Sequence, residues 1–87
     1  MNIQVKLFGA FRDWSSSGSV RLELPTEANV ADVRRVLGEQ LQQLRPHVDS
    51  NALLSDSVFA DDESTLLETD PIRPGQDLAI LPPVCGG

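Results

Sequence analysis

One amphipathic segment, residues 29–46, limits the folds that this chain can adopt. Asn29 is a suitable helix N-cap, Asp32 places a carboxylate in the first turn, and Pro46 ends the pattern. Between them, apolar residues recur at spacings of three and four, which predicts a helix with one apolar stripe. A second layer must cover that stripe, because burying it from water is favourable. The stripe consists of Val30, Val33, Leu37, Leu41 and Leu44.

Two segments before the helix alternate polar and apolar residues, which is the period of a strand with one buried face. The first covers residues 2–7, and the second covers residues 20–24 and stops at Pro25. Residues 9–14 are a transition and residues 15–18 a polar turn, so the two strands most simply form an antiparallel hairpin. Their expected buried side chains are Ile3, Val5, Leu7, Val20, Leu22 and Leu24.

The segment after the helix is less regular. Residues 57–60 indicate a short strand, and Leu66 and Leu67 begin a further brief strand or cap the core. The path between residues 49 and 70 is otherwise left open. Residues 78–81 are wholly apolar, which is typical of a strand in the middle of a sheet.

The order of these elements predicts an α+β fold, with one main helix packed across one face of a mixed sheet. The first and last strands are apolar enough to be central, and a right-handed crossover puts the helix on one face. Leu78 and Ile80 would then lie beneath the helix, whereas alternation turns Phe8, Ala79 and Leu81 to the other face. Two interpretations of that second face stay open: it binds a partner, or loops cover it.

The bulk composition indicates one small domain and narrows its partners. The chain has 87 residues, 40% of them hydrophobic, and we assign residues 1–81 to the domain and 82–87 to an extended tail. A net charge of -6 argues against nucleic acid and anionic membranes and favours a basic protein partner. No Lys or Arg occurs from Pro46 to Ile72, where the acids form either a solvated loop face or a docking surface.

The sequence favours a cytoplasmic protein. Its one cysteine, Cys85, excludes an internal disulfide and is compatible with a reducing compartment. The alternating start has no continuous apolar core of a secretory signal, and no segment is apolar for long enough to span a bilayer.

The last six residues, Pro82-Pro83-Val84-Cys85-Gly86-Gly87, combine stiffness with a thin tip. The prolines fix φ and favour an extended exit from the preceding strand, whereas the glycines have no Cβ. A stiff spacer before a slender terminus suits insertion into a narrow channel of another protein. The alternative is a frayed end, as is common at termini.

Four segments carry a resemblance to a known family. They are residues 5–13 (VKLFGAFRD), the Pro25-Thr26 pair, residues 74–84 (PGQDLAILPPV) and the terminal Gly86-Gly87. With these residues the chain resembles the ubiquitin-like sulfur carriers of the MoaD/ThiS type, most closely the small subunit of molybdopterin synthase. The resemblance runs the length of the domain and implies a β-grasp fold.

The resemblance implies chemistry at the carboxylate of Gly87. In that family an E1-like adenylating enzyme activates the terminal carboxylate with ATP. A sulfur donor, such as a cysteine desulfurase or rhodanese, supports its conversion to a thiocarboxylate. The thiocarboxylate then donates sulfur to cyclic pyranopterin monophosphate inside the large subunit of the synthase. On this interpretation Gly86 is the narrow residue that precedes Gly87, residues 82–84 are the spacer, and Cys85 is a neutral tail position. The chain itself would bind no cofactor or metal and catalyse nothing alone.

Three further positions match the family's docking surface. Phe8 and Leu81 resemble hydrophobic contacts for the adenylating enzyme and the large subunit, in agreement with their outward placement by alternation. Arg12 matches another position, although a surface ion pair with Asp13 or another acid is the interpretation that we favour for it.

Two other functions stay open. One is a sulfur carrier for another product, such as the thiamine thiazole. The other is a protein modifier joined to lysines through Gly87, or a plain ubiquitin-like binding domain. Lys6 is the only lysine, so the chain offers one internal acceptor besides its amino terminus.

Overall fold

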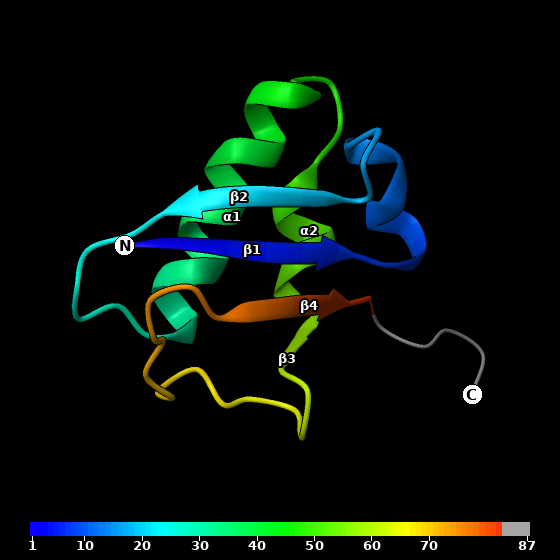
Figure 1. Ribbon diagram of the computed structural model, residues 1–87. Coiled ribbons are helices and arrows are strands. Elements are labelled where there is room, and N and C mark those ends of the chain that lie inside the picture. The colour runs from blue at the N-terminus through cyan, green and yellow to red at the C-terminus, as the bar shows by residue number, and fades with distance from the viewer. Residues whose placement is uncertain (83–87) are drawn as a thin grey trace.

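The computed structural model describes residues 1–82, apart from the side chains of Ala10, Ser50, Asn51 and Leu53. Within residues 1–82, four strands form one sheet in the order β2-β1-β4-β3, which confirms that the predicted first and last strands are central (Figure 1). β1 pairs antiparallel with β2 and parallel with β4, and β3 pairs antiparallel with β4. The strands are β1 (Asn2–Leu7), β2 (Ser19–Glu23), β3 (Val58–Ala60) and β4 (Asp77–Leu81).

The main helix, α1 (Val30–Leu44), lies across one face of this sheet, as predicted (Figure 1). Its start is fixed by a capping box, in which the Asn29 side chain accepts from the Asp32 N–H and the Asp32 carboxylate accepts from the Asn29 N–H. Both hydrogen bonds are 3.0 Å long and satisfy N–H groups that have no partner within the helix. The local sequence signal therefore set the helix boundary.

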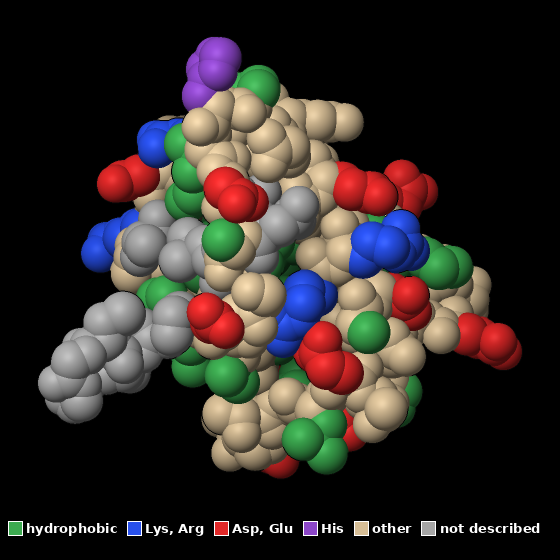
Figure 2. All heavy atoms as spheres, turned by 180° about the vertical axis from the view of Figure 1, so that it is seen from behind, with side chains coloured by type: hydrophobic (Ala, Val, Ile, Leu, Met, Phe, Trp, Pro, Cys, Tyr) green, Lys and Arg blue, Asp and Glu red, His purple; other side chains and the backbone are tan. Residues whose placement is uncertain are grey.

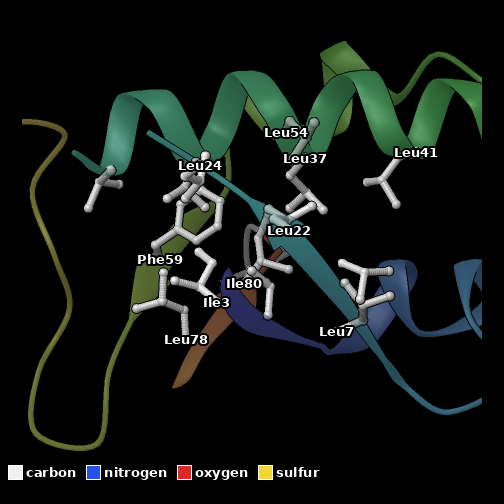
Figure 3. Close-up of a cluster of buried hydrophobic side chains, with 14 of the residues drawn as sticks. Ile3, Leu7, Leu22, Leu24, Leu37, Leu41, Leu54, Phe59, Leu78 and Ile80 are labelled. Carbon is white, nitrogen blue, oxygen red and sulfur yellow. The ribbon is translucent and has the colours of Figure 1, made fainter. Parts of the chain in front are cut away.

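The core lies between α1 and the sheet (Figure 3). Side chains that alternate along the central strands, such as Leu7 and Ile80, point toward the apolar stripe of α1 (Figure 3). Leu44 is the exception, because its side chain is 49% exposed. The predicted stripe was therefore one turn too long. The core ends at Leu41, whose carbonyl accepts a hydrogen bond from the Trp14 indole, and Leu44 lies beyond that point.

Two short helices were not predicted. The transition after β1 is a 3-10 helix, η1 (Gly9–Trp14), which buries Phe11 and Trp14 against the core. Part of the segment after α1 is a helix, α2 (Ser50–Ser55), whose N-cap Asp49 accepts a hydrogen bond from the Ala52 N–H. Trp14 covers the end of the core beside the C-terminal part of α1.

The connection from β3 to β4 is mostly irregular. A single bridge joins Ala60 to Thr65, so Leu66 and Leu67 do not extend a strand. Leu66 packs partly against the core, whereas Leu67 is 70% exposed. Only Leu66 therefore caps the core.

The acidic run serves local structure. Asp61 and Asp70 accept hydrogen bonds from backbone N–H groups of their own loops. Glu68 makes a two-pronged ion pair with Arg34 of α1, at 2.8 and 2.9 Å. Arg34 also donates to the carbonyl of Leu54 and lies 5.1 Å from the ring centroid of Phe59. One arginine thus ties α1 to α2, β3 and the connection.

Candidate functional site

Three exposed apolar side chains form a patch on the sheet face opposite α1. Phe8, Val58 and Leu81, here called the apolar patch, are 45%, 42% and 37% exposed. Their exposure excludes the interpretation that the described loops cover Phe8 and Leu81. The predicted outward placement of these two residues is confirmed.

Strand register brings the three side chains together. Leu7 lies opposite Ile80 in the parallel β1–β4 pair, so one step further Phe8 comes level with Leu81. Val58 is the partner of Leu81 in the antiparallel β3–β4 pair. The patch therefore crosses three adjacent strands at one end of the sheet, where β1 and β4 both finish (Figure 1).

Sequence reasoning did not assign Val58 to this surface. The signal was present, because Val58 precedes the fully buried Phe59 and must point to the opposite face. The strand register could not be read from the sequence, because only the pairing of β3 with β4 shows that Val58 lies beside Leu81.

Charges of opposite sign flank Phe8. One shallow hollow, about 340 Å³, is lined by Phe8 together with Lys6 and Arg12. A second, about 200 Å³, contains Phe8 and Lys6 with three carboxylates on its other side. Those carboxylates are Asp61, Asp62 and Asp77. The patch therefore has a basic margin toward β2 and an acidic margin toward β3.

Arg12 lies at the basic margin of the patch. Within residues 1–82 it meets neither Asp13 nor any other acid within salt-bridge distance, so the ion-pair interpretation of Arg12 was wrong. Its exposed guanidinium faces the same hollow as Phe8, which places it with the apolar patch.

Within the acidic margin, hydrogen bonds from its own loop stabilise the charged form of Asp61. The N–H groups of Glu63 and Ser64 each donate a 2.9 Å hydrogen bond to Asp61 Oδ1. These bonds favour the carboxylate and lower the pKa of Asp61 below its ordinary value. Asp61 is therefore negative at neutral pH.

β4 delivers the end of the described chain to the edge of the patch. Leu81 is its last residue, and Pro82 follows beside Gly9, at the start of η1. The other predicted tail residues lie outside the described residues; they are Pro83, Val84, Cys85, Gly86 and the predicted reacting residue Gly87.

The helix side of the molecule has a different character. Figure 2 shows charged side chains of both signs scattered over that face, between separate small apolar areas. None of the helices described between residues 1 and 82 is long and apolar enough to cross a membrane. Because the apolar areas on the helix side are small and separate, the apolar patch on the open sheet face is the better candidate for a docking surface.

The family model that matches this sequence is that of the ThiS family, over residues 5–87. The chain belongs to the ThiS family. No curated protein matches it significantly. The match covers nearly the whole chain and includes the terminal Gly86-Gly87.

Solved structures share the fold at low sequence identity. SAMP1 of Haloferax volcanii, a small archaeal modifier protein, is 24% identical with a TM-score of 0.72, and the likeness covers 100% of both chains. A Pyrococcus furiosus protein described as molybdopterin converting factor subunit 1 is 23% identical, also at 0.72, over 95% of this chain and 98% of that one. The fold is thus the β-grasp fold of these ubiquitin-like proteins, as the sequence predicted.

Proposed function

We propose that this ThiS-family chain is a sulfur carrier that acts through the carboxylate of Gly87. An adenylating enzyme activates the carboxylate, a sulfur donor converts it to a thiocarboxylate, and the thiocarboxylate gives its sulfur to cyclic pyranopterin monophosphate in molybdopterin synthesis. The chain binds no cofactor in this scheme, because ATP is used by the adenylating partner.

The observation that carries the proposal is where the family match ends. It continues through Gly86-Gly87, on a chain whose last strand is central and finishes at the apolar patch. A partner that binds Phe8 and Leu81 would therefore hold the chain beside the point where the tail leaves the sheet. Docking and delivery of the terminus would then be parts of one binding event.

The chemistry explains why a partner must supply the catalytic groups. A carboxylate is a poor electrophile, so its oxygen first attacks the α-phosphorus of ATP and displaces pyrophosphate. The outer sulfur of the donor's persulfide then attacks the acyl carbon of the adenylate, and AMP leaves. A thiol reductant cleaves the sulfur–sulfur bond of the resulting acyl disulfide, which releases the thiocarboxylate. The apolar patch provides binding area rather than acid–base groups, so these steps belong to the active site of the adenylating enzyme.

The partner proposed for the final step is the large subunit of molybdopterin synthase. The likeness to molybdopterin converting factor subunit 1 supports this choice of pathway over thiamine thiazole synthesis. Recovery of that large subunit from the native host by the full chain would support the choice. Recovery of a thiazole synthase in its place would move the carrier to the other pathway.

Intact-mass spectrometry tests the carrier chemistry. The chain is incubated with ATP, an adenylating enzyme, a thiol reductant and a sulfur source, which is cysteine with a cysteine desulfurase or thiosulfate with a rhodanese. It should gain the mass difference between sulfur and oxygen. The gain should disappear when ATP is omitted, and in a variant that lacks Gly87 but retains the melting temperature of the parent. A truncated chain that still supports molybdopterin formation would contradict the proposal.

A protein modifier is the second candidate, favoured by the full-length likeness to a small archaeal modifier protein. The same incubation distinguishes it, because attachment through Gly87 would yield adducts at lysines of other proteins. Adducts without a sulfur-bearing form of the free chain would favour the modifier.

A further inference from the structure

Gly9 touches the first residue of the tail, Pro82. The backbone of Gly9 has φ +58°, a conformation that residues with a Cβ rarely adopt. A Cβ atom placed on Gly9 would lie 2.6 Å from Cγ of Pro82 and 3.4 Å from its Cδ. Real Cβ atoms do not come so close to another carbon. Glycine at this position therefore leaves the space that the proline ring occupies.

Register accounts for the contact. β1 and β4 are parallel neighbours, with Leu7 opposite Ile80. Two steps further along both chains, Gly9 comes level with Pro82. The contact continues the strand pair beyond its last hydrogen-bonded residues, one position after the Phe8 and Leu81 side chains of the apolar patch.

The element that carries Gly9 is held in place. η1 buries Phe11 completely and Trp14 almost completely. The Trp14 indole donates a 3.2 Å hydrogen bond to the Leu41 carbonyl, and the Arg45 guanidinium donates a 2.8 Å bond to the Asp13 carbonyl. A side chain added at position 9 would therefore have to move Pro82 rather than η1.

Pro82 cannot turn its ring aside. The ring is closed onto its own backbone nitrogen, so Cγ and Cδ follow the main chain. Moving the ring out of contact changes the direction in which the main chain leaves β4. The contact with Gly9 thus sets the orientation of Pro82 itself.

We propose that Gly9 is a positioning residue, which seats Pro82 and so aims the tail at the active site of the adenylating enzyme. The functional part of this inference rests on the proposed function; the geometric part does not. Gly9 contributes no binding energy to the partner in this scheme. It decides whether the bound carrier presents its terminus to the reacting groups.

The chain provides a matched control for backbone strain. Gly75 has φ +74°, as strained for an alanine as Gly9, but nothing lies within 4 Å of the Cβ that it would gain. It belongs to the turn before β4, at the strand end remote from Pro82. Gly75→Ala therefore introduces the same kind of strain without the collision, and Gly9→Ala introduces both.

The first experiment measures geometry and needs no partner. The free protein should show a nuclear Overhauser effect between the Gly9 Hα protons and the Pro82 ring. A nitroxide label on Cys85, the only cysteine, should broaden a different set of sheet amides in Gly9→Ala than in the parent and in Gly75→Ala. The same broadening pattern in all three proteins would show that Gly9 does not position Pro82, and would overturn the inference.

The second experiment measures ATP–pyrophosphate exchange with the adenylating enzyme. Gly9→Ala should lower kcat about ten- to a hundredfold, as a misplacement of about 1 Å can, while the KM for the carrier changes less than about twofold. Gly75→Ala should leave both values near those of the parent. Combining Gly9→Ala with Pro82→Ala removes the ring and should restore kcat to within about threefold of Pro82→Ala alone.

The outcomes separate the inference from the proposed function. Equal kcat losses in Gly9→Ala and Gly75→Ala, or no rescue by Pro82→Ala, would overturn the positioning role. Suppose that Gly9→Ala changes the broadening pattern but the parent protein shows no ATP–pyrophosphate exchange. That result would support the positioning of Pro82 by Gly9 and contradict the sulfur-carrier proposal. A loss confined to KM would assign Gly9 to docking and also overturn the inference.

Discussion

Phe8 lies one residue past Leu7, and that single step moves a side chain from the core to the open face. Leu7 is 2% exposed and Phe8 is 45% exposed. The same step separates Ile80 from Leu81 on the neighbouring strand. Because β1 and β4 are parallel and in register, the two outward steps coincide and form a surface that neither strand has alone. Exposure at these positions costs little stability, so their apolar character is available for binding.

If the proposed function holds, we expect Phe8→Glu to weaken binding to the proposed adenylating enzyme without unfolding the domain. A charge at the centre of an apolar contact should raise Kd at least about tenfold. The melting temperature should change little, because the wild-type ring is already half in water. Isothermal titration calorimetry and thermal melts measure the two effects.

Leu67→Glu is the matched control for Phe8→Glu. Leu67 is 70% exposed but lies in the connection from β3 to β4, away from the apolar patch. The Leu67→Glu substitution should therefore leave Kd unchanged. Equal losses of affinity in both variants would show that net charge, rather than the patch, controls docking.

The helices and strands that could be predicted from the sequence are those whose signals lie within their own segments. α1 and β1 were predicted because their periods and the Asn29 cap lie within the segments themselves. η1 and α2 have six residues each, too few for a period to show, and tertiary packing around Trp14 and Leu54 stabilises them. Leu44 fitted the helical period but lies past the edge of the sheet, which no helical period can reveal.

The candidate site divides in the same way. Phe8 and Leu81 were predicted by alternation and by family resemblance together. The places of Val58 and of the Arg12 guanidinium, which has no ion pair among residues 1–82, required the fold, because both depend on which segments become neighbours. The prediction that Gly87 is the reacting residue came from the resemblance alone, and it stays a prediction because Gly87 lies outside the described residues.

The ion pair between Arg34 of α1 and Glu68 of the β3–β4 connection should make the free energy of unfolding fall at acid pH. The Arg34 guanidinium lowers the pKa of Glu68 below its ordinary value of 4.5. A lowered pKa in the folded state means that the pair stabilises the fold above the unfolded-state pKa. That stabilisation is lost as the pH falls through the folded-state pKa. Because Glu68 is half exposed, we expect the loss to be about 0.5 kcal/mol.

Urea melts at pH 7 and pH 3 measure this contribution. Glu68→Gln should be less stable than the parent at pH 7 and should lose less stability on acidification. Glu63→Gln changes a carboxylate that has no arginine partner among residues 1–82, and it should show the parent's full acid loss. A parent-like pH dependence in Glu68→Gln would exclude the ion pair as its source.

On the scale of the whole molecule, the most distant parts of the sequence form the centre of the sheet. β1 and β4 share the middle positions, and both lie over the fully buried part of α1. α2 and the connection between β3 and β4 lie at the periphery. Arg34 contacts both, and Leu54 anchors α2 in the core. The connection is also held by backbone hydrogen bonds to the start of α1 and by the buried Ile72. Cooperative unfolding should therefore be governed by the central pair.

Hydrogen exchange should resolve these two levels of stability. Amides of β1 and β4 should exchange only through global unfolding, with free energies equal to that from urea melts. Amides of α2 should exchange faster, through local opening. Arg34→Ala should accelerate α2 selectively, whereas equal protection in β1 and α2 would contradict this hierarchy.

The parallel pairing of β1 and β4 also determines how the fold responds to mechanical force. Met1 and Pro82 lie at opposite ends of this pair, because the two strands run in the same direction. Tension applied between these residues acts along the strands and loads their hydrogen bonds together, in shear, instead of opening them one after another. A molecular machine that pulls on the chain beyond Pro82 while Met1 is held would thus load the sheet in its most resistant direction, and the fold would resist unfolding under that force.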